Sequence, residues 1–463
     1  MGSGISKHCA VCMMSNIAPA RMCAYDVLRQ VDTADAYAHI ALRAAIERRR
    51  LPAVDVGLAS ELVAGVLTAQ RLLDDSISRH SRIAFAKLDP RVVVILRMSI
   101  YQIAFLSRIP HYAVVADAVE MAKQAAPRAA GFVNAVLRSL LRQKDWRTLW
   151  SELPTPLPSR SEIGLHLSYP DFLVDHFCNS CGDMFGSEVM LAQNRRKGRT
   201  LRINSARCTR DEVIALLAEE GVEAEESPIS PFGVRLPAGV NPSMLRAYTT
   251  GMCSLQGESS MLIAPLLGSL NGKRVLDACA APGGKALHMA ELAADDTSIT
   301  AVDIHAHRVA TIRRQAERLR LQSVQTVVAD ARTVTGDYDA VLLDAPCSGL
   351  GTIGRHPDIK WRAKPGEIES LVALQKDLLD AMAERVRPGG ILLYTTCTLS
   401  PLENAVQIER FLERRSDFSP VPVVLPVPLD LQTRPQDPDG QRHIWPQDFD
   451  SDGFFVAKLQ RHG

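Results

Sequence analysis

Two cysteines and an aspartate follow apolar runs that have the length of buried strands. Cys397 stands in LLYTTCTLSP (392–401), and Asp344 and Cys347 stand in LLDAPCSGLG (342–351). Parallel strands of an open α/β sheet end at one edge, where ligands bind, so the two thiols are expected at adjacent strand ends. A thiolate is a strong nucleophile, whereas a buried cysteine is more often inert packing, and this pattern alone leaves both open.

The other cysteines favour neither a disulfide scaffold nor a metal site. Ten cysteines in 463 residues are few for a disulfide framework, and a chain without a secretory signal is expected in a reducing compartment. Two C-x-x-C pairs occur, Cys9/Cys12 and Cys178/Cys181, but no histidine has zinc-ligand spacing beside either. We expect free thiols and no metal.

Three further strand ends suit a nucleoside-bearing cofactor. DACAAPGGK turns from a strand into a helix through small residues that let a ligand approach the backbone. Asp303 ends the next strand about 20 residues later, the spacing that places a carboxylate on a ribose diol. Asp330 ends the third and is placed to accept a hydrogen bond from an adenine amine. Strand-end aspartates are often helix caps, but three in register beside a glycine turn favour a cofactor site. The turn comprises Cys279, Ala280, Ala281, Pro282, Gly283, Gly284 and Lys285.

Cations and an aromatic residue follow the strand that carries Asp344. RHPDIKWR (355–362) contains Arg355, His356, Lys360 and Trp361 in one segment. Cations interleaved with an aromatic ring suit a phosphate backbone and an exposed base. Residues 21–150 hold 19 Lys and Arg against 12 Asp and Glu, so the front of the chain also favours a polyanionic partner.

The pattern of elements predicts three folded parts behind a flexible leader, residues 1–20. Apolar residues recur at helical spacing over 21–147, which predicts an all-α domain of about six helices. Residues 148–235 are expected to form a Pro- and Ser-rich linker (151–164) and a small α+β connector. Over 236–463 strands and helices alternate, and apolar runs without polar alternation predict a doubly wound parallel sheet.

The composition is that of an ordinary soluble chain, 46% hydrophobic and 23% charged. No uninterrupted apolar run approaches the roughly 18 residues of a membrane helix. The start of the chain fits the short M-G-x-x-x-[ST] acylation pattern, which matches often by chance. We therefore expect a cytoplasmic protein that does not enter a membrane.

Several of these motifs together resemble a known family. DACAAPGGK, DAPCSG, GRHPDIKW, TTCTLSPLEN and SDGFFVAKL are similar to the motif set of the S-adenosylmethionine-dependent RNA cytosine-5 methyltransferases of the RsmB/Nop2/Sun family. GFVNAVLR and the helices before it resemble the NusB-like RNA-binding domain that a bacterial small-subunit ribosomal RNA enzyme joins to this catalytic domain. The resemblance covers about 21–463, and it departs from the usual pattern at Glu258, Ala286, Leu350 and Gly354.

The resemblance implies a role for each matching residue. Cys397 would add to carbon 6 of cytosine, which makes carbon 5 nucleophilic, and Cys347 would assist product release. Asp344 would hydrogen-bond or protonate ring nitrogen 3, and Lys285 would position the base or that carboxylate. Beyond the turn 279–285, the expected cofactor contacts are Asp303, Arg308, Asp330 and Asp344, and the expected RNA contacts are Arg138, Arg142, Arg355, His356, Lys360 and Trp361.

The implied partner is 16S ribosomal RNA before full subunit assembly, bound by a monomer. Three alternatives stay open: another RNA such as tRNA, DNA cytosine methylation with Cys347 as the nucleophile, and a non-catalytic NusB-like RNA-binding scaffold. The scaffold would be favoured if either cysteine or Asp344 were missing, and all three are present.

Overall fold

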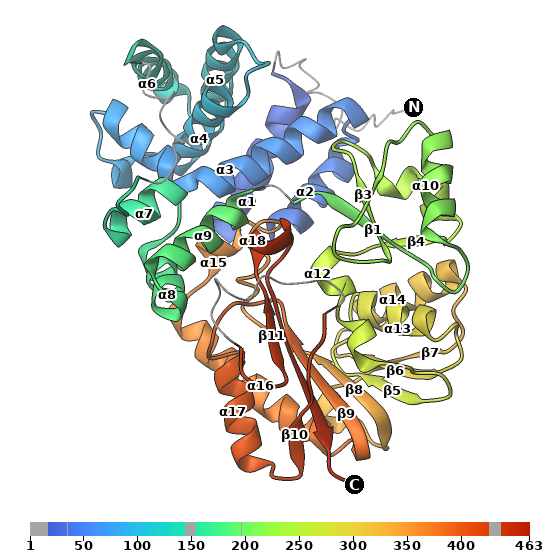
Figure 1. Cartoon of the computed structure of the whole chain (residues 1–463). Coiled ribbons are helices and arrows are strands. Elements are labelled where there is room, and N and C mark those ends of the chain that lie inside the picture. Colours follow the sequence, from blue (N-terminus) through green and yellow to red (C-terminus); the bar gives the residue numbers. More distant parts are fainter. Residues whose placement is uncertain (1–16, 35, 144–153, 196, 426–436) are drawn as a thin grey trace, which may run out of the picture. The chain divides into compact units, whose positions relative to one another are not determined.

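The computed structural model describes residues 17–34, 36–143, 154–195, 197–425 and 437–463 (Figure 1). The chain divides into two compact units, Met1–Tyr169 and Pro170–Gly463. Cys9, Cys12 and the amino-terminal acylation pattern lie outside the described residues. Each unit is built around its own apolar interior.

The first unit is helical, as the periodicity predicts. Asp89 caps one helix by accepting a hydrogen bond from the backbone N–H of Arg91, with Pro90 in the first turn. Its helices are α1 (Pro19–Ala34), α2 (Ala38–Arg49), α3 (Ala53–His80), α4 (Pro90–Phe105), α5 (His111–Ala125), α6 (Ala130–Gln143) and α7 (Arg160–Leu167).

Helix α3 is the central helix of this unit and packs against α1 and α4. Within the described ranges, α3 is the one helix long and apolar enough to cross a membrane by length and composition. Leu62, Leu67 and Leu73 on it are fully buried inside the unit. A core helix passes the same test of length and hydropathy, so α3 by itself is weak evidence for a membrane span.

Helix α7 begins inside the segment expected to be a linker, 151–164, and ends beyond it. Its start is a capping box, in which the Ser159 hydroxyl accepts from the Glu162 N–H and the Glu162 carboxylate accepts from the Ser159 N–H. The backbone N–H of Arg71 on α3 donates to the Ser168 hydroxyl at 3.0 Å, and the Arg71 guanidinium donates to the Tyr169 carbonyl at 2.6 Å. The proline-rich composition predicts a linker, but the Ser-x-x-Glu spacing starts a helix that packs on α3.

The second unit begins with two helices and a small antiparallel sheet of order β2-β3-β1-β4. Thr209 and Glu212 form the expected capping box, and Gly221 follows the helix end with a φ of 74°. The elements are α8 (Asp171–Cys181), α9 (Asp183–Asn194), β1 (Arg199–Ile203), α10 (Arg210–Glu219), β2 (Glu225–Glu226), β3 (Gly233–Leu236), α11 (Arg246–Thr249) and β4 (Cys253–Leu255).

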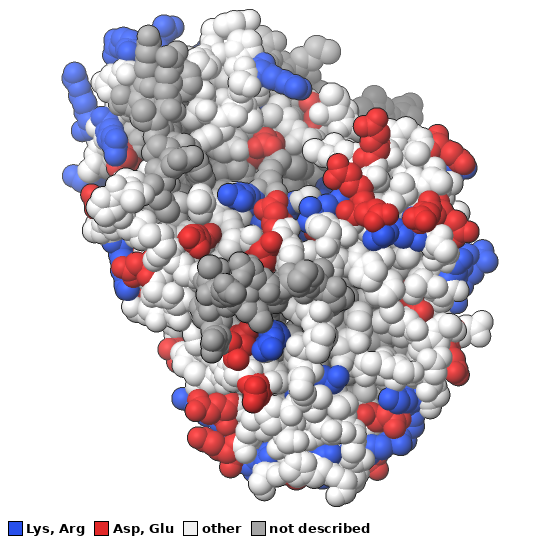
Figure 2. All heavy atoms as spheres, viewed as in Figure 1, with Lys and Arg blue, Asp and Glu red and all other residues white. Residues whose placement is uncertain are grey.

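The face of this connector that Figure 2 shows is acidic rather than basic. Acidic side chains gather at the upper right of the view, over α10 and the strands beside it (Figure 2). Glu219, Glu223, Glu225 and Glu226 are all exposed. Glu219 pairs with Arg246 and Glu226 with Arg210, so arginines offset part of this negative charge.

The large sheet has the order β10-β12-β9-β8-β5-β6-β7, with β11 paired to β12. Strands β5 to β9 pair in parallel, and β12 joins β9 antiparallel. Chain order reverses at β5, which lies between β8 and β6, so a ligand crevice is expected at the carboxyl ends there. The strands are β5 (Arg274–Asp277), β6 (Ser298–Asp303), β7 (Val324–Val328), β8 (Tyr338–Asp344), β9 (Val386–Thr396), β10 (Phe418–Pro420), β11 (Gln441–Ile444) and β12 (Phe454–Arg461).

Helices cover both faces of this sheet (Figure 1). Along β8, Ala340 and Leu342 join the apolar cluster on one face, while Val341 and Leu343 join that on the other. Both faces are buried, which explains why the run has no polar alternation. The helices are α12 (Glu258–Met261), α13 (Gly284–Leu292), α14 (Ala306–Leu319), α15 (Ile359–Arg362), α16 (Pro365–Ala383), α17 (Ala405–Arg414) and α18 (Pro446–Phe449).

A fully buried ion pair joins the connector to the large sheet domain. Arg202 on β1 donates to both carboxylate oxygens of Glu291 on α13, at 2.7 and 2.8 Å. It also donates to the Gly284 carbonyl at 2.7 Å. A buried ion pair with saturated hydrogen bonds is rigid, so β1 fixes the first turn of α13.

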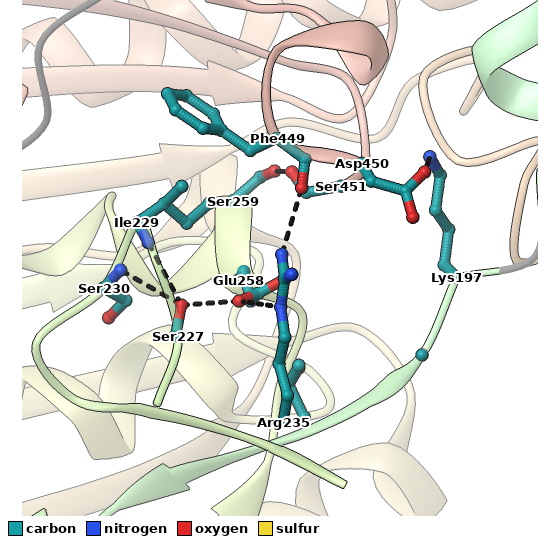
Figure 3. A network of polar contacts seen from close by, with 12 residues as sticks. Lys197, Ser227, Ile229, Ser230, Arg235, Glu258, Ser259, Phe449, Asp450 and Ser451 are labelled. Atoms are coloured by element: carbon teal, nitrogen blue, oxygen red, sulfur yellow. Dashed lines mark hydrogen bonds and ion pairs between the residues drawn. The ribbon is translucent and has the colours of Figure 1, made fainter. Parts of the chain in front are cut away.

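The carboxyl-terminal segment is held against the connector by a second polar network (Figure 3). Arg235 on β3 bonds Glu258 at 2.8 Å and the Phe449 carbonyl at 3.0 Å. Lys197, whose side chain is nearly buried, pairs with Asp450 at 2.8 Å. The connector and the sheet domain therefore share polar contacts on two sides.

Candidate active site

The two cysteines lie together at the carboxyl ends of β8 and β9. The parallel register of these strands pairs Asp344 with Thr395. The two loops that follow bring Cys347 Sγ to 3.4 Å from Cys397 Sγ, and both residues are of intermediate exposure. The pairing of two parallel strands thus brings together thiols that are 50 residues apart in the chain.

Cys397 opens into a cavity of about 350 Å³ whose walls come entirely from the second unit. Within it, Lys285 Nζ forms an ion pair with Asp344 Oδ2 at 2.6 Å. The same ammonium lies 5.1 Å from the centre of the Phe454 ring. The cavity therefore combines a thiol, a carboxylate, a cation and an aromatic face, enough to hold a planar polar ring and move its protons.

Asn404 holds the backbone on both sides of Cys397. Its side chain accepts a hydrogen bond from the Thr396 hydroxyl at 2.7 Å and donates to the Thr398 carbonyl at 3.0 Å. Glu403, the preceding residue, holds the Cys347 loop through Ser348. The sequence analysis gave neither Glu403 nor Asn404 a role, although both stand in the motif TTCTLSPLEN. Their presence as two adjacent polar residues in that motif was the signal that could have identified them.

The surroundings of Cys347 favour its protonated form. The hydrogen bond with Cys397 raises the pKa of Cys347 well above its ordinary value, and burial acts in the same direction. The negative charges of Cys397, Glu403 and Asp344 raise this pKa further. Either sulfur can donate in this contact, and these surroundings favour a protonated Cys347.

The expected cofactor turn is tight and glycine-dependent. Gly283 has a φ of 103°, and a Cβ there would lie 3.2 Å from Ile312. Asp277, at the end of β5, is buried and neither carboxyl oxygen meets a hydrogen-bond partner with good geometry in the described residues. Burial, followed by the charge of Asp344, raises the pKa of Asp277 to about 8. A buried carboxyl next to an open glycine turn is suited to a ligand that brings donors.

The next two strand ends offer a carboxylate beside an apolar surface. Asp303 accepts from the His305 N–H at 2.9 Å and pairs in register with Val328. Ile304 is 60% exposed and Val328 52% exposed, an apolar pair that a flat ring could cover. The residues present therefore fit a nucleoside cofactor, and sequence reasoning missed the apolar pair.

Two residues expected to contact the cofactor, Asp330 and Arg308, are respectively engaged with a neighbouring residue and exposed. Asp330 caps a short 3₁₀ helix through the Arg332 N–H and forms an ion pair with the Arg332 guanidinium at 2.6 Å. Capping is the role that strand-end aspartates often have. Arg308 is exposed on α14. Their contacts with a cofactor stay predictions.

The residues expected to contact RNA lie in three places: on the cavity wall, on α15 and on α6. Arg355 lies on the cavity wall, donating to Asp452 at 2.5 Å and to the Gly198 carbonyl at 3.1 Å, and His356 also lines the cavity. Trp361 is partly exposed on α15. Arg138 and Arg142 are exposed on α6 of the helical unit.

Lys360 differs from the other expected RNA contacts, because its side chain lies in the protein interior. It is fully buried, Nζ donates to Asn194 Oδ1 at 2.6 Å, and burial lowers its pKa well below the ordinary value. In this structure its ammonium does not reach the surface, and we do not retain it as an RNA contact. Cation spacing along the sequence carries no information on which side chain faces inward.

The second C-x-x-C pair lies on α8. Cys178 is buried, and the Cys181 thiol donates to the Phe177 carbonyl at 3.1 Å. Burial raises the pKa of Cys181 to about 12. Across the ranges the structure describes, no group of three or more His, Cys, Asp or Glu side chains could hold a metal ion.

Models of protein families match all three parts of the chain. The model described as 16S rRNA methyltransferase RsmB/F matches residues 264–460. The NusB family matches 18–142, and the ferredoxin-like domain of RsmF/B-like methyltransferases matches 169–242. The matches follow one another in the order in which the structure has a helical unit, a small sheet and a large sheet.

Individual relatives cover almost the whole chain. The probable ribosomal RNA small subunit methyltransferase B of Bacillus subtilis (strain 168) is 34% identical over 446 residues, 95% of this chain and 98% of that protein. The ribosomal RNA small subunit methyltransferase B of Cronobacter sakazakii is 35% identical and covers 88% of this chain and 90% of its own length.

Solved structures agree with this relationship. The crystal structure of PH0851 is 27% identical with a TM-score of 0.78, covering 96% of this chain and 99% of its own. A methyltransferase homolog protein from Pyrococcus horikoshii is 26% identical with a TM-score of 0.58, over 66% of this chain and 99% of its own. With its thiol pair, its glycine turn and its helical unit, the chain belongs to the RsmB/F family of 16S rRNA methyltransferases.

Proposed function

We propose that this protein transfers a methyl group from S-adenosylmethionine to carbon 5 of a cytosine in 16S ribosomal RNA. The observation that carries the proposal is the pair of thiols, 3.4 Å apart, at the edge of a cavity that also holds the Lys285–Asp344 ion pair. Family membership supports the reaction class, and the names of the relatives support the RNA.

Cys397 acts as the nucleophile. Carbon 5 of cytosine is too poor a nucleophile to take a methyl group unaided. When the Cys397 sulfur bonds to carbon 6, electron density moves to carbon 5, and one difficult step becomes two easier ones. Asp344 lies on the wall of the same cavity and hydrogen-bonds or protonates ring nitrogen 3 during this addition.

Lys285 orients Asp344 and neutralises charge in the cavity. Its side chain is nearly buried between the Asp344 carboxylate and the Phe454 ring. An ammonium held on both sides keeps one position, so the carboxylate that meets the base is preorganised. Phe454 supplies a flat apolar wall for the ring of the base.

Cys347 assists release of the product. After methyl transfer a base takes the carbon-5 proton, the bond from carbon 6 to the Cys397 sulfur breaks, and the double bond of the ring returns. In this proposal Cys347 is protonated and donates its proton to the departing sulfur, which lies 3.4 Å away. Without Cys347 the covalent adduct is expected to persist.

S-Adenosylmethionine, when bound, supplies an electrophilic methyl group. The residues that would hold it are the turn 279–285, with Asp303 for the ribose and Ile304 and Val328 for the adenine ring. Asp330 and Arg308 extend this site in the proposal. Gly283 keeps the shape of this turn, because its φ of 103° is one that a residue with a Cβ rarely adopts.

The helical unit contributes RNA binding through its exposed cations, of which Arg138 and Arg142 are our candidates. We propose that the substrate is RNA not yet fully assembled into the subunit, and that the protein acts as a cytoplasmic monomer. A tRNA substrate is the second candidate, since an exposed base on a shaped RNA is all that the cavity requires.

The test is methyl transfer from labelled S-adenosylmethionine to deproteinised 16S ribosomal RNA. We expect label at cytosine carbon 5, no activity in Cys397→Ala, and a covalent protein–RNA adduct in Cys347→Ala. Cys181→Ala is the matched control, because that thiol lies on α8, outside the cavity, and it should behave as wild type. Retained activity in Cys397→Ala would show that this cysteine is not the nucleophile, and label in tRNA but not 16S RNA would favour the second candidate.

A further inference from the structure

Glu403 is a fully buried carboxylate directly behind the Cys347 loop. Oε1 accepts from the backbone N–H of Ser348 at 2.9 Å and from the Gln375 amide at 3.0 Å. Oε2 accepts from the Ser348 hydroxyl at 2.5 Å. None of the residues that the structure describes forms an ion pair with it. Burying a carboxylate without a cation raises the free energy of the folded state, and a neutral side chain in the same space would avoid this desolvation penalty.

The Ser348 hydroxyl connects this carboxylate to the other cysteine loop. Its oxygen lies 2.7 Å from the Thr398 hydroxyl. A carboxylate can only accept, so Ser348 donates to Glu403 and therefore accepts from Thr398. Ser348 directly follows Cys347 in the chain, and Thr398 directly follows Cys397. A chain of two hydrogen bonds thus joins Glu403 to the residues next to both thiols.

Gln375 on α16 holds the other side of the Cys347 loop. Its side-chain nitrogen donates to the Pro346 carbonyl at 2.8 Å as well as to Glu403. Pro346 and Ser348 are the two neighbours of Cys347, so the loop is fixed both before and after the thiol. The position of Cys347 therefore depends on the Glu403 carboxylate and on the amide it orients.

We propose that Glu403 is a positioning residue of the methyl-transfer reaction, whose carboxylate fixes the Cys347 loop against the Cys397 loop at the spacing that the two thiols need. The inference rests on the proposed function, since it assigns Glu403 a part in that same reaction. Glu403 lines no part of the cavity and acts through the cysteine loops.

The charge of Glu403 has a second effect, on the proton of Cys347. The groups that face this thiol are Cys397, Glu403 and Asp344, and all of them raise its pKa. Lys285 is paired with Asp344 and offsets part of that charge. A neutral residue at position 403 removes one of the negative charges, so the pKa of Cys347 should fall.

The first experiment measures this effect without substrate. The protein is alkylated with iodoacetamide over a series of pH values, and modification of each cysteine is followed by peptide mass spectrometry. In Glu403→Gln the half-maximal rate at Cys347 should move to lower pH. Cys181 on α8 is the internal control, and its profile should not move.

The second experiment measures methyl transfer. In Glu403→Gln the amide NH₂ replaces one carboxylate oxygen and cannot accept the hydrogen bond that Ser348 or Gln375 donated to it. With that hydrogen bond lost, the Cys347 loop and its thiol should change position. We expect kcat to fall about 10- to 100-fold, as a small misplacement of reacting groups does, with KM values for RNA and S-adenosylmethionine within about threefold. Glu369→Gln makes the same chemical change at an exposed position of α16 and should leave both constants unchanged.

Two further variants separate charge from geometry and guard against misfolding. Glu403→Asp keeps the charge but is one methylene shorter, so the Cys347 profile should stay near wild type while kcat stays low. Ser348→Ala leaves the carboxylate in place and removes only the hydroxyl link, and about a tenfold loss of kcat is expected even if Glu403→Gln does not fold.

The outcomes distinguish the two proposals. An unchanged kcat and an unmoved Cys347 profile in a folded Glu403→Gln protein would overturn the positioning role. If the wild-type protein transfers no methyl group to RNA, the proposed function is wrong, and so is the role of Glu403 in that reaction. A shift of the Cys347 profile in Glu403→Gln would then still show that the charge of Glu403 acts on the thiol.

Discussion

Replacing Asp277 by Asn should shift the difference in stability between variant and wild type in favour of the variant as the pH rises. Burial and the charge of Asp344 raise the pKa of Asp277 to about 8, from 3.8 in the unfolded chain. Between these values the folded protein must hold a proton that the unfolded chain releases. The stability associated with this carboxyl is therefore full below about pH 4 and is lost progressively as the pH rises to about 8.

The magnitude follows from the difference in protonation. Each unit of pH between the two pKa values costs about 1.4 kcal/mol, so wild type loses about 4 kcal/mol between pH 4 and pH 7 through this group. The asparagine side chain of the Asp277→Asn variant does not titrate. Its unsatisfied amide contributes an offset that is the same at every pH, so the comparison across pH isolates the carboxyl.

The assay is urea denaturation of wild type and Asp277→Asn at pH 5, 6 and 7, in the absence of cofactor. The difference in free energy of unfolding should move in favour of the variant by about 2 to 3 kcal/mol from pH 5 to pH 7. Asp339→Asn, at a strand end where the carboxylate pairs with Arg387, is the control and should not show that trend. A difference that is constant across these pH values would refute the reasoning, because Asp277 would then be ionised in the folded state.

Three other predictions concern stability and cofactor binding. Arg202→Met leaves Glu291 buried without its partner and should lower the free energy of unfolding by about 3 to 5 kcal/mol in urea titrations, far more than loss of an exposed pair. Burial, followed by the charge of Arg202, lowers the pKa of His288 well below 6.5, so this group alone costs wild type about 1.4 kcal/mol per pH unit as the pH falls below about 6.5. In the same titrations the difference between His288→Leu and wild type should therefore move in favour of the variant as the pH falls. Gly283→Ala forces a Cβ to 3.2 Å from Ile312 at a φ of 103°, and calorimetry should show S-adenosylmethionine binding weakened at least tenfold. Each of these three predictions is contradicted if the variant and wild type give the same result in the named measurement.

The positions of the candidate site residues could be predicted from local sequence because each stands at a strand end. An apolar run that stops at Cys397, and another that stops at Asp344, place both at the edge where an open sheet binds ligands. The glycine turn and Asp303 followed from the same rule. The Thr209–Glu212 capping box was also a local signal, and it needed no tertiary information.

Other features depend on contacts between distant segments. The antiparallel strand β12 pairs with β9 and brings Phe454 to the cavity, and nothing in its local pattern says which strand it joins. Lys360 and Arg355 stand five residues apart in one basic segment, yet one is fully buried and the other lines the cavity. Helix α7 begins at Arg160, inside the expected linker, where it packs on α3.

Local sequence was sufficient to predict the order of the elements, the class of the sheet and the residue types at the strand ends, because hydrophobic periodicity and turn residues act over a few positions. The 3.4 Å between the thiols, the pairing of Lys285 with Asp344 and the burial of Glu403 behind the Cys347 loop came from tertiary structure. These features depend on strand register and on side-chain packing across the sheet, which no local pattern encodes.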